Sequence, residues 1–273
     1  MPVSVRKAPA APVATIAHVT TRAVVFDLDD TLIVEESYAM ASLREALGTL
    51  PGIDPVASEQ TALEAARSVW KTGGDYQRCV ELGFASWEGL WSTFEGNHHS
   101  VAGLVAWAPT YRIKAWRAIG AAVGVDDPML LSSAAQRFED AQRRGHPIIE
   151  GMHDTIAEMG ARHPLGLITN GPSDIQRLKL DQAGLSSTFA VEVISGELGV
   201  GKPEPEVFLG LLERLGAAPE ASLMVGDSWE RDIEGGLAAG MSAVWIADGR
   251  TPPAELPRVK VVDSVVELIG LLD

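Results

Sequence analysis

Hydrophobic residues recur along this chain in two patterns, and the change between them divides the sequence. Between about residues 35 and 148 they recur every three to four positions, as in Met40, Leu43 and Leu47, which predicts amphipathic helices. Near residue 24, and again from about residue 150, short continuous apolar runs predict strands that are buried on both faces. The pattern therefore predicts an α/β core interrupted by an all-helical insert.

Proline and glycine divide the insert into helices, because neither residue fits well inside a regular helix. Ser86 is expected to cap a short helix that carries Trp91, and Pro109 suits the first turn of a helix that carries Trp116. No strand is expected in the insert. The expected helix boundaries are Pro51, Gly73, Gly96, Pro109, Pro128 and Gly145.

After the insert, strands and helices alternate with lengths typical of βαβ units, which predicts a parallel sheet. Ser173 or Asp174 is expected to cap the helix after the second strand, and Asp263 or Ser264 starts the closing helix. Intervening helices are expected to end at Gly184, Gly216 and Gly240. The expected strands cover residues 24–27, 165–169, 191–194, 222–227, 242–246 and 259–262, the last one at an edge.

The predicted fold is α/β: a Rossmann-like parallel-sheet core with helices on both faces, plus an inserted helical cap. The core is expected to comprise residues 21–34 and 149–273, and the cap residues 35–148. Residues 1–20, rich in Ala, Pro, Val and Thr, are expected to be a disordered extension.

Composition narrows the possible partners and the location. The 273 residues include 22 Lys and Arg against 37 Asp and Glu, a net charge of −15, which disfavours nucleic-acid polymers and anionic membrane surfaces as partners. The single cysteine, Cys79, excludes an internal disulfide and fits a reducing compartment. No apolar run reaches the roughly 18–20 residues that span a bilayer, and the first residues lack the apolar run of a signal peptide. The sequence therefore predicts a cytoplasmic protein.

Polar residues at the ends of predicted strands are the candidates for chemistry, because ligands of open α/β sheets bind at the carboxyl ends of the strands. Asp27 and Asp29 follow the first strand, and residues two apart in an extended chain point to the same side. Further candidates at strand or loop ends are Thr169, Asn170, Gly171, Lys202, Asp227 and Asp232.

The carboxylates of Asp27, Asp227 and Asp232 would offer the hard oxygen ligands that Mg²⁺ prefers. The sequence does not support a thiolate or histidine metal site. An anionic substrate of so acidic a chain would need local positive charge from Lys202, a metal ion or backbone amides.

These motifs in this order resemble the haloacid dehalogenase-like hydrolase superfamily, in the branch with a helical cap between the first and second motifs. The motifs are Asp27-Leu28-Asp29-Asp30-Thr31, Thr169, Lys202, and Gly226-Asp227 followed by Asp232. The resemblance covers about residues 22 to 250, although the cap matches only as a helical insert. It implies a Mg²⁺-dependent phosphatase of small soluble phosphate monoesters.

By this resemblance, Asp27 would be the nucleophile that attacks phosphorus and forms an aspartyl-phosphate. Asp29 would protonate the leaving oxygen and later activate water, and its backbone carbonyl would ligate Mg²⁺. Lys202 would neutralise charge on both the nucleophile and the phosphate.

The remaining motif residues would bind phosphate or metal by the same resemblance. Thr169, with the backbone at Asn170 and Gly171, would hold phosphoryl oxygens. Asp227 would ligate the metal ion, and Asp232 would position Lys202 or metal-bound water.

Several alternatives stay open at this stage. The carboxylate of Asp29 favours a phosphatase over a dehalogenase, because halide leaves without a proton whereas an alkoxide benefits from one. A phosphonatase would need a Schiff-base lysine in the cap, and nothing marks Lys71 or Lys114 as one. A phosphosugar mutase or a non-catalytic binding module is the remaining alternative.

The cap contains five of the seven tryptophans, mostly expected to pack its own core, with one or two facing the substrate. A cap of this kind favours a sugar phosphate or a nucleoside monophosphate as substrate. The sequence leaves open the physiological substrate, the cap residues that read it, the oligomeric state and the pathway.

Overall fold

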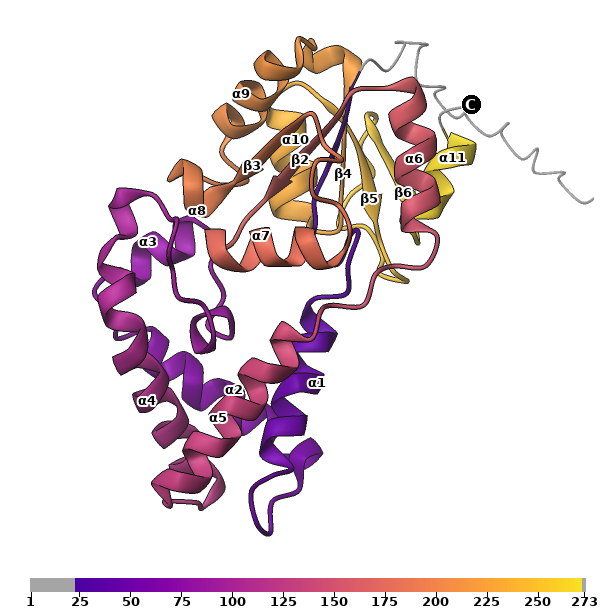
Figure 1. Cartoon of the computed structure of the whole chain (residues 1–273). Coiled ribbons are helices and arrows are strands. Elements are labelled where there is room, and N and C mark those ends of the chain that lie inside the picture. The colour runs from indigo at the N-terminus through magenta and orange to yellow at the C-terminus, as the bar shows by residue number, and fades with distance from the viewer. Residues whose placement is uncertain (1–22, 272–273) are drawn as a thin grey trace, which may run out of the picture.

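The structure is a computed structural model, and it describes residues 23–271. It has two parts, a sheet flanked by helices and a helical cap, joined by two neighbouring segments of chain (Figure 1). The extension expected at residues 1–20 lies outside the described residues. No helix in the described part combines the length and apolar character needed to cross a bilayer.

All strand pairs of the six-stranded sheet are parallel, and the strand order is β3-β2-β1-β4-β5-β6. The central strand β1 pairs its Phe26 with Leu167 of β2 and with Val225 of β4. This confirms the predicted α/β class, and β6 lies at an edge as expected. The strands are β1 (Ala23–Phe26), β2 (Leu165–Thr169), β3 (Val191–Ile194), β4 (Ser222–Gly226), β5 (Ser242–Ile246) and β6 (Val259–Val262).

Helices cover both faces of the sheet, because alternate strand residues point to opposite sides. Val24 and Phe26 pack with one set of helices, and Val25 between them packs with the other. The first set is α6 (Met152–Arg162), α7 (Ser173–Gln182) and α11 (Leu268–Leu271). The second includes α9 (Pro205–Leu215) and α10 (Gly235–Ala238). A short helix, α8 (Ser195–Leu198), follows β3.

The helical cap has a hydrophobic core of its own, in which Trp70, Trp91, Tyr111 and Phe138 are buried. Its helices are α1 (Glu36–Leu47), α2 (Pro55–Trp70), α3 (Tyr76–Glu81), α4 (Gly103–Val123) and α5 (Pro128–Arg143). Ile175 of α7, in the sheet part, belongs to this core cluster, and Leu178 of the same helix packs against it. Helix α7 therefore forms the floor on which the cap sits.

Backbone hydrogen bonds tie together the two segments that join cap and sheet. Val34 N donates to Pro147 O at 2.8 Å, and Ile149 N donates to Leu32 O at 3.0 Å. These two hydrogen-bonded segments, residues 32–35 and 146–149, are called the stalk, and they join the cap to the sheet part as a pair rather than as two independent linkers. The domain boundaries expected at residues 34/35 and 148/149 fall within this stalk and stay a prediction.

Two expectations for the cap were wrong. Pro109 lies inside α4, which begins at Gly103, and not in its first turn. Pro109 and Val105, whose carbonyl loses its helical partner, both lie on the exposed side of the helix, where water can replace the bond. Ser86 caps no helix. Only a 3₁₀ turn, Glu88–Leu90, follows it, and the Glu88 carboxylate accepts from Ala85 N at 2.7 Å.

Helix ends elsewhere depend on contacts that are distant in sequence. Neither Ser173 nor Asp174 caps α7, whose N-cap is Pro172. Asp174 instead accepts from Ser92 Oγ and Thr93 N of the cap, both at 2.7 Å. Ser264 does begin the closing helical segment, through a capping box with Glu267.

Helices α3 and α6 were not predicted from the sequence, although the apolar residues of α6 have helical spacing.

Candidate active site

A cavity of about 590 Å³ lies where the carboxyl ends of the central strands face the cap. Asp27 directly follows β1, Asp227 directly follows β4, and Lys202 lies in the loop before α9. All three line this cavity. The parallel arrangement of the strands explains the convergence, since their carboxyl ends meet at one edge of the sheet.

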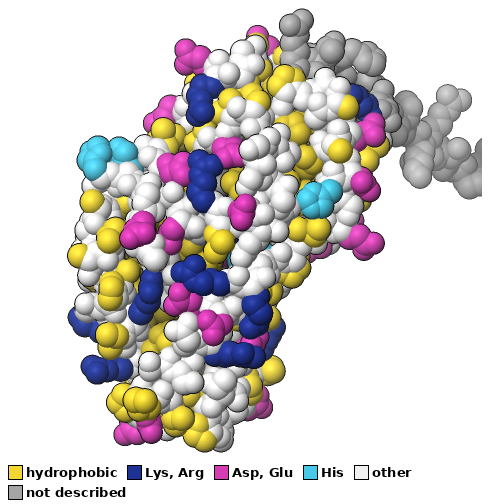
Figure 2. Space-filling model, viewed as in Figure 1, with side chains coloured by type: hydrophobic (Ala, Val, Ile, Leu, Met, Phe, Trp, Pro, Cys, Tyr) yellow, Lys and Arg dark blue, Asp and Glu magenta, His cyan; other side chains and the backbone are white. Residues whose placement is uncertain are grey.

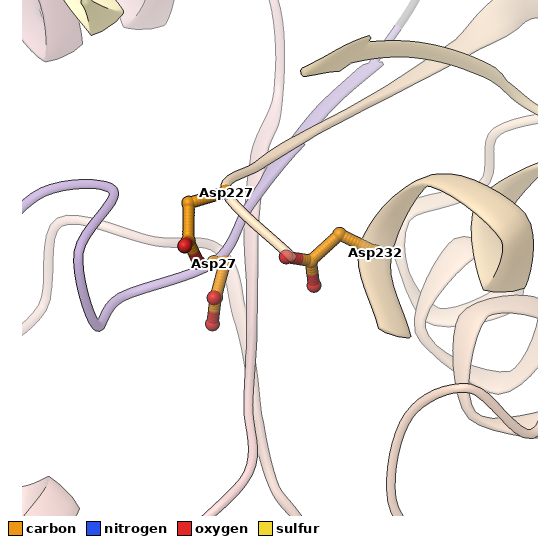
Figure 3. A group of neighbouring side chains, drawn as sticks. All are labelled: Asp27, Asp227 and Asp232. Atoms are coloured by element: carbon orange, nitrogen blue, oxygen red, sulfur yellow. The ribbon is translucent and has the colours of Figure 1, made fainter. Parts of the chain in front are cut away.

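Lys202 joins two carboxylates at the floor of the cavity. Its Nζ lies 2.6 Å from Asp27 Oδ1 and 2.6 Å from Asp232 Oδ1. Asp232 Oδ2 in turn accepts from Ser228 N at 2.9 Å. Asp232 lies in a π-helical segment, Trp229–Glu234, whose wide turn directs this side chain back toward β4. Asp27, Asp227 and Asp232 lie close together and come from separate elements of the fold (Figure 3).

The Lys202 loop is fixed by the side chain of Asn170 at the end of β2. Asn170 Nδ2 donates to Lys202 O, and Lys202 N donates to Asn170 Oδ1, both at 2.9 Å. Because both groups are buried, losing the pair would leave two backbone groups without partners. The amide of Asn170 thus holds the lysine loop in place beside Asp27.

Thr169 and Gly171, the residues on either side of Asn170, form hydrogen bonds with other residues of the protein. Gly171 N donates to Ser195 Oγ at 3.0 Å, and Thr169 Oγ1 accepts from Gln176 Nε2. Of the three motif residues, Asn170 alone lines the cavity as the structure describes it. The phosphate-binding roles expected for Thr169 and Gly171 stay predictions.

Negative charge is concentrated around this cluster. Burial, together with the neighbouring Asp232 carboxylate, raises the pKa of Asp27 well above its usual range. The pKa of Asp227 is raised to about 6, first by burial and then by Asp232. Burial disfavours the charge on Lys202, yet the carboxylates of Asp232 and Asp27 outweigh it and raise the pKa of the lysine. The site therefore holds more negative than positive charge.

This excess charge fits a divalent cation. One oxygen from each of Asp27, Asp227 and Asp232 lies within 4.8 Å of the others. Carboxylate oxygens are the ligands that Mg²⁺ prefers, and a divalent charge would relieve the repulsion that raises the pKa of Asp227. Asp29, also expected at the metal through its backbone carbonyl, does not contribute its carboxylate to this cluster.

The Asp29 carboxylate is held by helix α7 instead. Lys179 Nζ lies 3.0 Å from Asp29 Oδ1, and Gln176 Nε2 donates to Asp29 Oδ2 at 3.0 Å. Asp29 still lines the cavity, with 22% of its side chain exposed, whereas the Lys179 side chain is completely buried. Asp27 and Asp29 are therefore two residues apart in the chain but have separate partners.

Lys179 also binds the stalk and the cap. Its Nζ lies 2.8 Å from Glu35 Oε2 and 3.9 Å from Glu88 Oε1. Burial of Glu35 is outweighed by Lys179 and His146, which lower its pKa to about 2. Burial raises the pKa of Glu88 to about 8. His146 Nε2, from the returning stalk segment, lies 2.8 Å from Glu35 Oε2.

Lys179 and Gln176 were not predicted from the sequence as residues of the site. Gln176 and Lys179 are three residues apart and so lie on one face of α7, which the sequence shows. Polar residues on one helix face are ordinarily solvated, however. Only the tertiary structure brings Asp29 of the sheet part, Glu35 of the stalk and Glu88 of the cap to this face.

The cap supplies the opposite wall of the cavity, including Trp70 and Trp87. Trp70 also packs in the cap core, and Trp87 Nε1 donates to Glu35 Oε1 at 3.2 Å. Trp91 and Trp116 are buried in the cap core. Basic side chains on this wall are Arg67 and Lys71.

Comparisons with known proteins agree with this architecture. Residues 21–240 match the family model of the haloacid dehalogenase-like hydrolases. The chain is 34% identical over 241 residues to a phosphoserine phosphatase of Thermus thermophilus, covering 87% of this chain and 94% of that protein. It is 30% identical over 234 residues to a glyceraldehyde 3-phosphate phosphatase of Methanopyrus kandleri, covering 84% of this chain and 85% of that protein.

Among solved structures, the magnesium-bound HAD-hydrolase YfnB from Bacillus subtilis has a similar fold. The TM-score is 0.64 at 22% sequence identity, covering 93% of this chain and 99% of that one. At this identity the likeness concerns the fold, and it includes both the sheet part and the cap.

Proposed function

The chain belongs to the haloacid dehalogenase-like hydrolases, and we propose that it is a Mg²⁺-dependent phosphatase acting through an aspartyl-phosphate intermediate. Its substrate would be a small phosphate monoester, with sugar phosphates and nucleoside monophosphates as the first classes to test. The observation that carries the proposal is the contact of Lys202 with Asp27 beside two further aspartates at the cavity floor. The names of the two long-coverage relatives, both phosphatases, support it.

In the first step, a carboxylate oxygen of Asp27 attacks phosphorus and the bond from phosphorus to the ester oxygen breaks. The carboxyl of Asp29 gives its proton to the departing oxygen. Lys202 lies against Asp27, so its ammonium lowers the repulsion between the carboxylate and the phosphate. A covalent intermediate divides one difficult displacement into two easier ones.

In the second step, Asp29 takes a proton from a water molecule, which attacks the phosphorus of the aspartyl-phosphate. The bond between phosphorus and the Asp27 oxygen breaks. Inorganic phosphate is released, and the free carboxylate of Asp27 is restored. Asp29 lines the same cavity as Asp27 and is held at both oxygens, which suits a group that must act twice from one position.

The metal ion would be held by Asp27 and Asp227, with Asp232 next to them and the backbone carbonyl of Asp29 as a further ligand. When bound, Mg²⁺ would neutralise charge on the transferring phosphoryl group. The cap, taken as residues 35–148, would close over the cavity, exclude bulk water and select the substrate. We place the enzyme in the cytoplasm, which suits the buried, unpaired thiol of Cys79.

The test is phosphate release from a panel of metabolite monoesters, with and without Mg²⁺. Asp27→Asn serves as the blank, because it preserves the size of the side chain and removes the nucleophile. We expect phosphate release that chelation abolishes and that Asp27→Asn lowers to background. Release by Asp27→Asn at the parental rate would refute the nucleophile assignment, and an isomeric phosphate ester in place of free phosphate would indicate a mutase.

A further inference from the structure

Two basic side chains on the cap wall of the cavity have no partner. Arg67 is half-buried on α2, and Lys71 follows four residues later at the end of that helix, so both lie on one helix face. Both line the cavity that contains Asp27 and Lys202. Across residues 23–271, no carboxylate pairs with either of them.

Several other arginines of the cap pair with acids, for example Arg44 with Glu59 and Arg143 with Glu139, and Arg117, which has no such pair among residues 23–271, is exposed on α4 outside this cavity. In a chain with 37 acidic and 22 basic residues, two unpaired cations side by side in a cavity call for an explanation. An anion bound at the half-buried guanidinium of Arg67 would offset the loss of water around its charge. The carboxylates that line this cavity include those of Asp27, Asp29 and Asp227 at the reaction centre.

We propose that Arg67 and Lys71 form a second anion subsite, so that the substrate is a phosphate monoester that also carries a carboxylate. This inference rests on the proposed function and specifies its substrate class. The phosphate would lie at Lys202, the carboxylate at Arg67 and Lys71, and the carbon skeleton along the aromatic side chains between them, Trp70, Tyr76 and Phe84. A guanidinium can hold a carboxylate through two parallel hydrogen bonds, which fixes its orientation.

The experiment compares two esters that differ only in the carboxylate, O-phosphoserine and O-phosphoethanolamine, with p-nitrophenyl phosphate as an ester with no second anion. The parent is expected to have a kcat/KM about 10- to 100-fold higher for the carboxylate member, the range of charge-assisted hydrogen bonds. Arg67→Gln and Lys71→Gln are expected to lose this preference through a higher KM for O-phosphoserine, with the other two esters unchanged. Arg117→Gln and Lys114→Gln, exposed on α4 and outside the cavity, are the matched controls.

Two results would overturn the inference alone: a parent without preference for the carboxylate member, or an equal loss on all three esters in Arg67→Gln. The second result would mean that Arg67 binds the transferring phosphate. Failure of the parent to release phosphate from any ester of the wider panel would instead refute the proposed function. The two failures are therefore distinguishable.

A second inference comes from a different observation, the two contacts that α7 makes with Asp29. Lys179 holds one carboxylate oxygen of Asp29 and Gln176 the other, each at 3.0 Å. Lys179 is itself fixed by Glu35 of the stalk at 2.8 Å. Both donors come from one helix, and both are buried, so the Asp29 carboxylate has little freedom to rotate.

We infer that Lys179 and Gln176 are positioning residues, which aim the Asp29 carboxyl at the leaving oxygen of the substrate. A misaimed acid matters only when the leaving group needs a proton. An alkyl phosphate needs one because it releases an alkoxide, whereas p-nitrophenolate leaves without one. A purely structural role would lower both rates together.

The test is the ratio of kcat for an alkyl ester to kcat for p-nitrophenyl phosphate. Lys179→Met and Gln176→Ala are expected to lower this ratio about tenfold, a fraction of the full effect of a general acid, and Lys179→Arg to restore part of it. Glu88→Gln, which leaves both contacts of Asp29 in place, is the matched control and should keep the parental ratio. If Lys179→Met does not fold, Gln176→Ala carries the test. An unchanged ratio in folded Lys179→Met or in Gln176→Ala would refute the inference.

Discussion

Two buried lysines, Lys202 and Lys179, make similar contacts in regions with different tasks. Each ammonium lies within 3.0 Å of two carboxylates. Lys202 lies on a loop at the cavity floor, beside the proposed nucleophile. Lys179 lies on helix α7, on the side of the sheet part next to the cap (Figure 1). There it contacts residues of the sheet part, the stalk and the cap.

The difference lies in what surrounds each lysine. The partners of Lys202 belong to a group of aspartates that could also hold a divalent cation, so charge there can be balanced in more than one way. Among residues 23–271, the only further cation paired with the carboxylates around Lys179 is His146, beside Glu35. The ammonium of Lys202 is thus available to chemistry, and that of Lys179 is committed to the junction of cap and sheet. On the face of the molecule that Figure 2 shows, by contrast, charges of both signs are dispersed.

The largest expected effect is on stability, in Lys179→Met. The substitution leaves Glu35 and the carboxylates around it buried without their main counter-charge, and breaking a buried ion pair in this way costs up to about 5 kcal/mol. The free energy of unfolding, from urea denaturation, should fall accordingly, with Lys114→Met as the exposed control. A loss below about 1 kcal/mol would show that the network contributes little.

Next in size is the loss of activity in Lys202→Met. Without the ammonium, the Asp27 carboxylate meets the phosphate unscreened, and kcat should fall about 10³-fold, as when one preorganised donor is removed. Stability should change less than in Lys179→Met, because the pKa of Asp27 is already raised and this group can bind a proton. Steady-state kinetics and urea denaturation of Lys202→Met and Lys179→Met together test whether the first lysine serves mainly activity and the second mainly stability. Equal stability losses would remove the distinction between the two lysines.

Third comes the pH dependence of stability, through Glu88. Its pKa is raised by burial from an ordinary 4.5 to about 8, so the folded state favours the protonated form. This stabilisation is complete below about pH 4.5 and is lost as pH rises toward 8, because the unfolded state gives up the proton earlier. Glu88→Gln imitates the protonated form, and its unfolding free energy should exceed that of the parent by on the order of 3 kcal/mol at pH 7. Parallel pH profiles for parent and variant would contradict the assignment.

The smallest expected effect is that of Asn170→Ala, which loosens the loop of Lys202 without touching its ammonium. Two buried backbone groups of Lys202 lose their partners, at a cost of about 2 kcal/mol. Urea denaturation measures this loss, and a modest fall in kcat should accompany it. Parental stability in this variant would show that the loop is held by other contacts.

Much of the fold could be predicted from the sequence because its signals are local. Short apolar runs such as Leu165–Thr169 indicate buried strands, and their alternation with helices indicates parallel pairing. The capping box at Ser264 is likewise contained in four residues. Asp174 was misinterpreted because its partners, Ser92 and Thr93, are more than 80 residues away in the chain.

The candidate active site likewise combines features that the sequence predicts with contacts that only the folded chain brings together. The sequence alone identified Asp27 and Asp227 at strand ends, which a parallel sheet brings to one edge, and Lys202 and Asp232 through the order of the motifs. The structure brings these four side chains together. Only the tertiary structure decided that Lys179 faces Asp29, Glu35 and Glu88, and that Arg67 lines the cavity without a carboxylate partner in the described part of the chain. The physical reason is that the packing of the cap against α7 depends on contacts across the whole chain, and no local spacing encodes which polar helix face becomes buried.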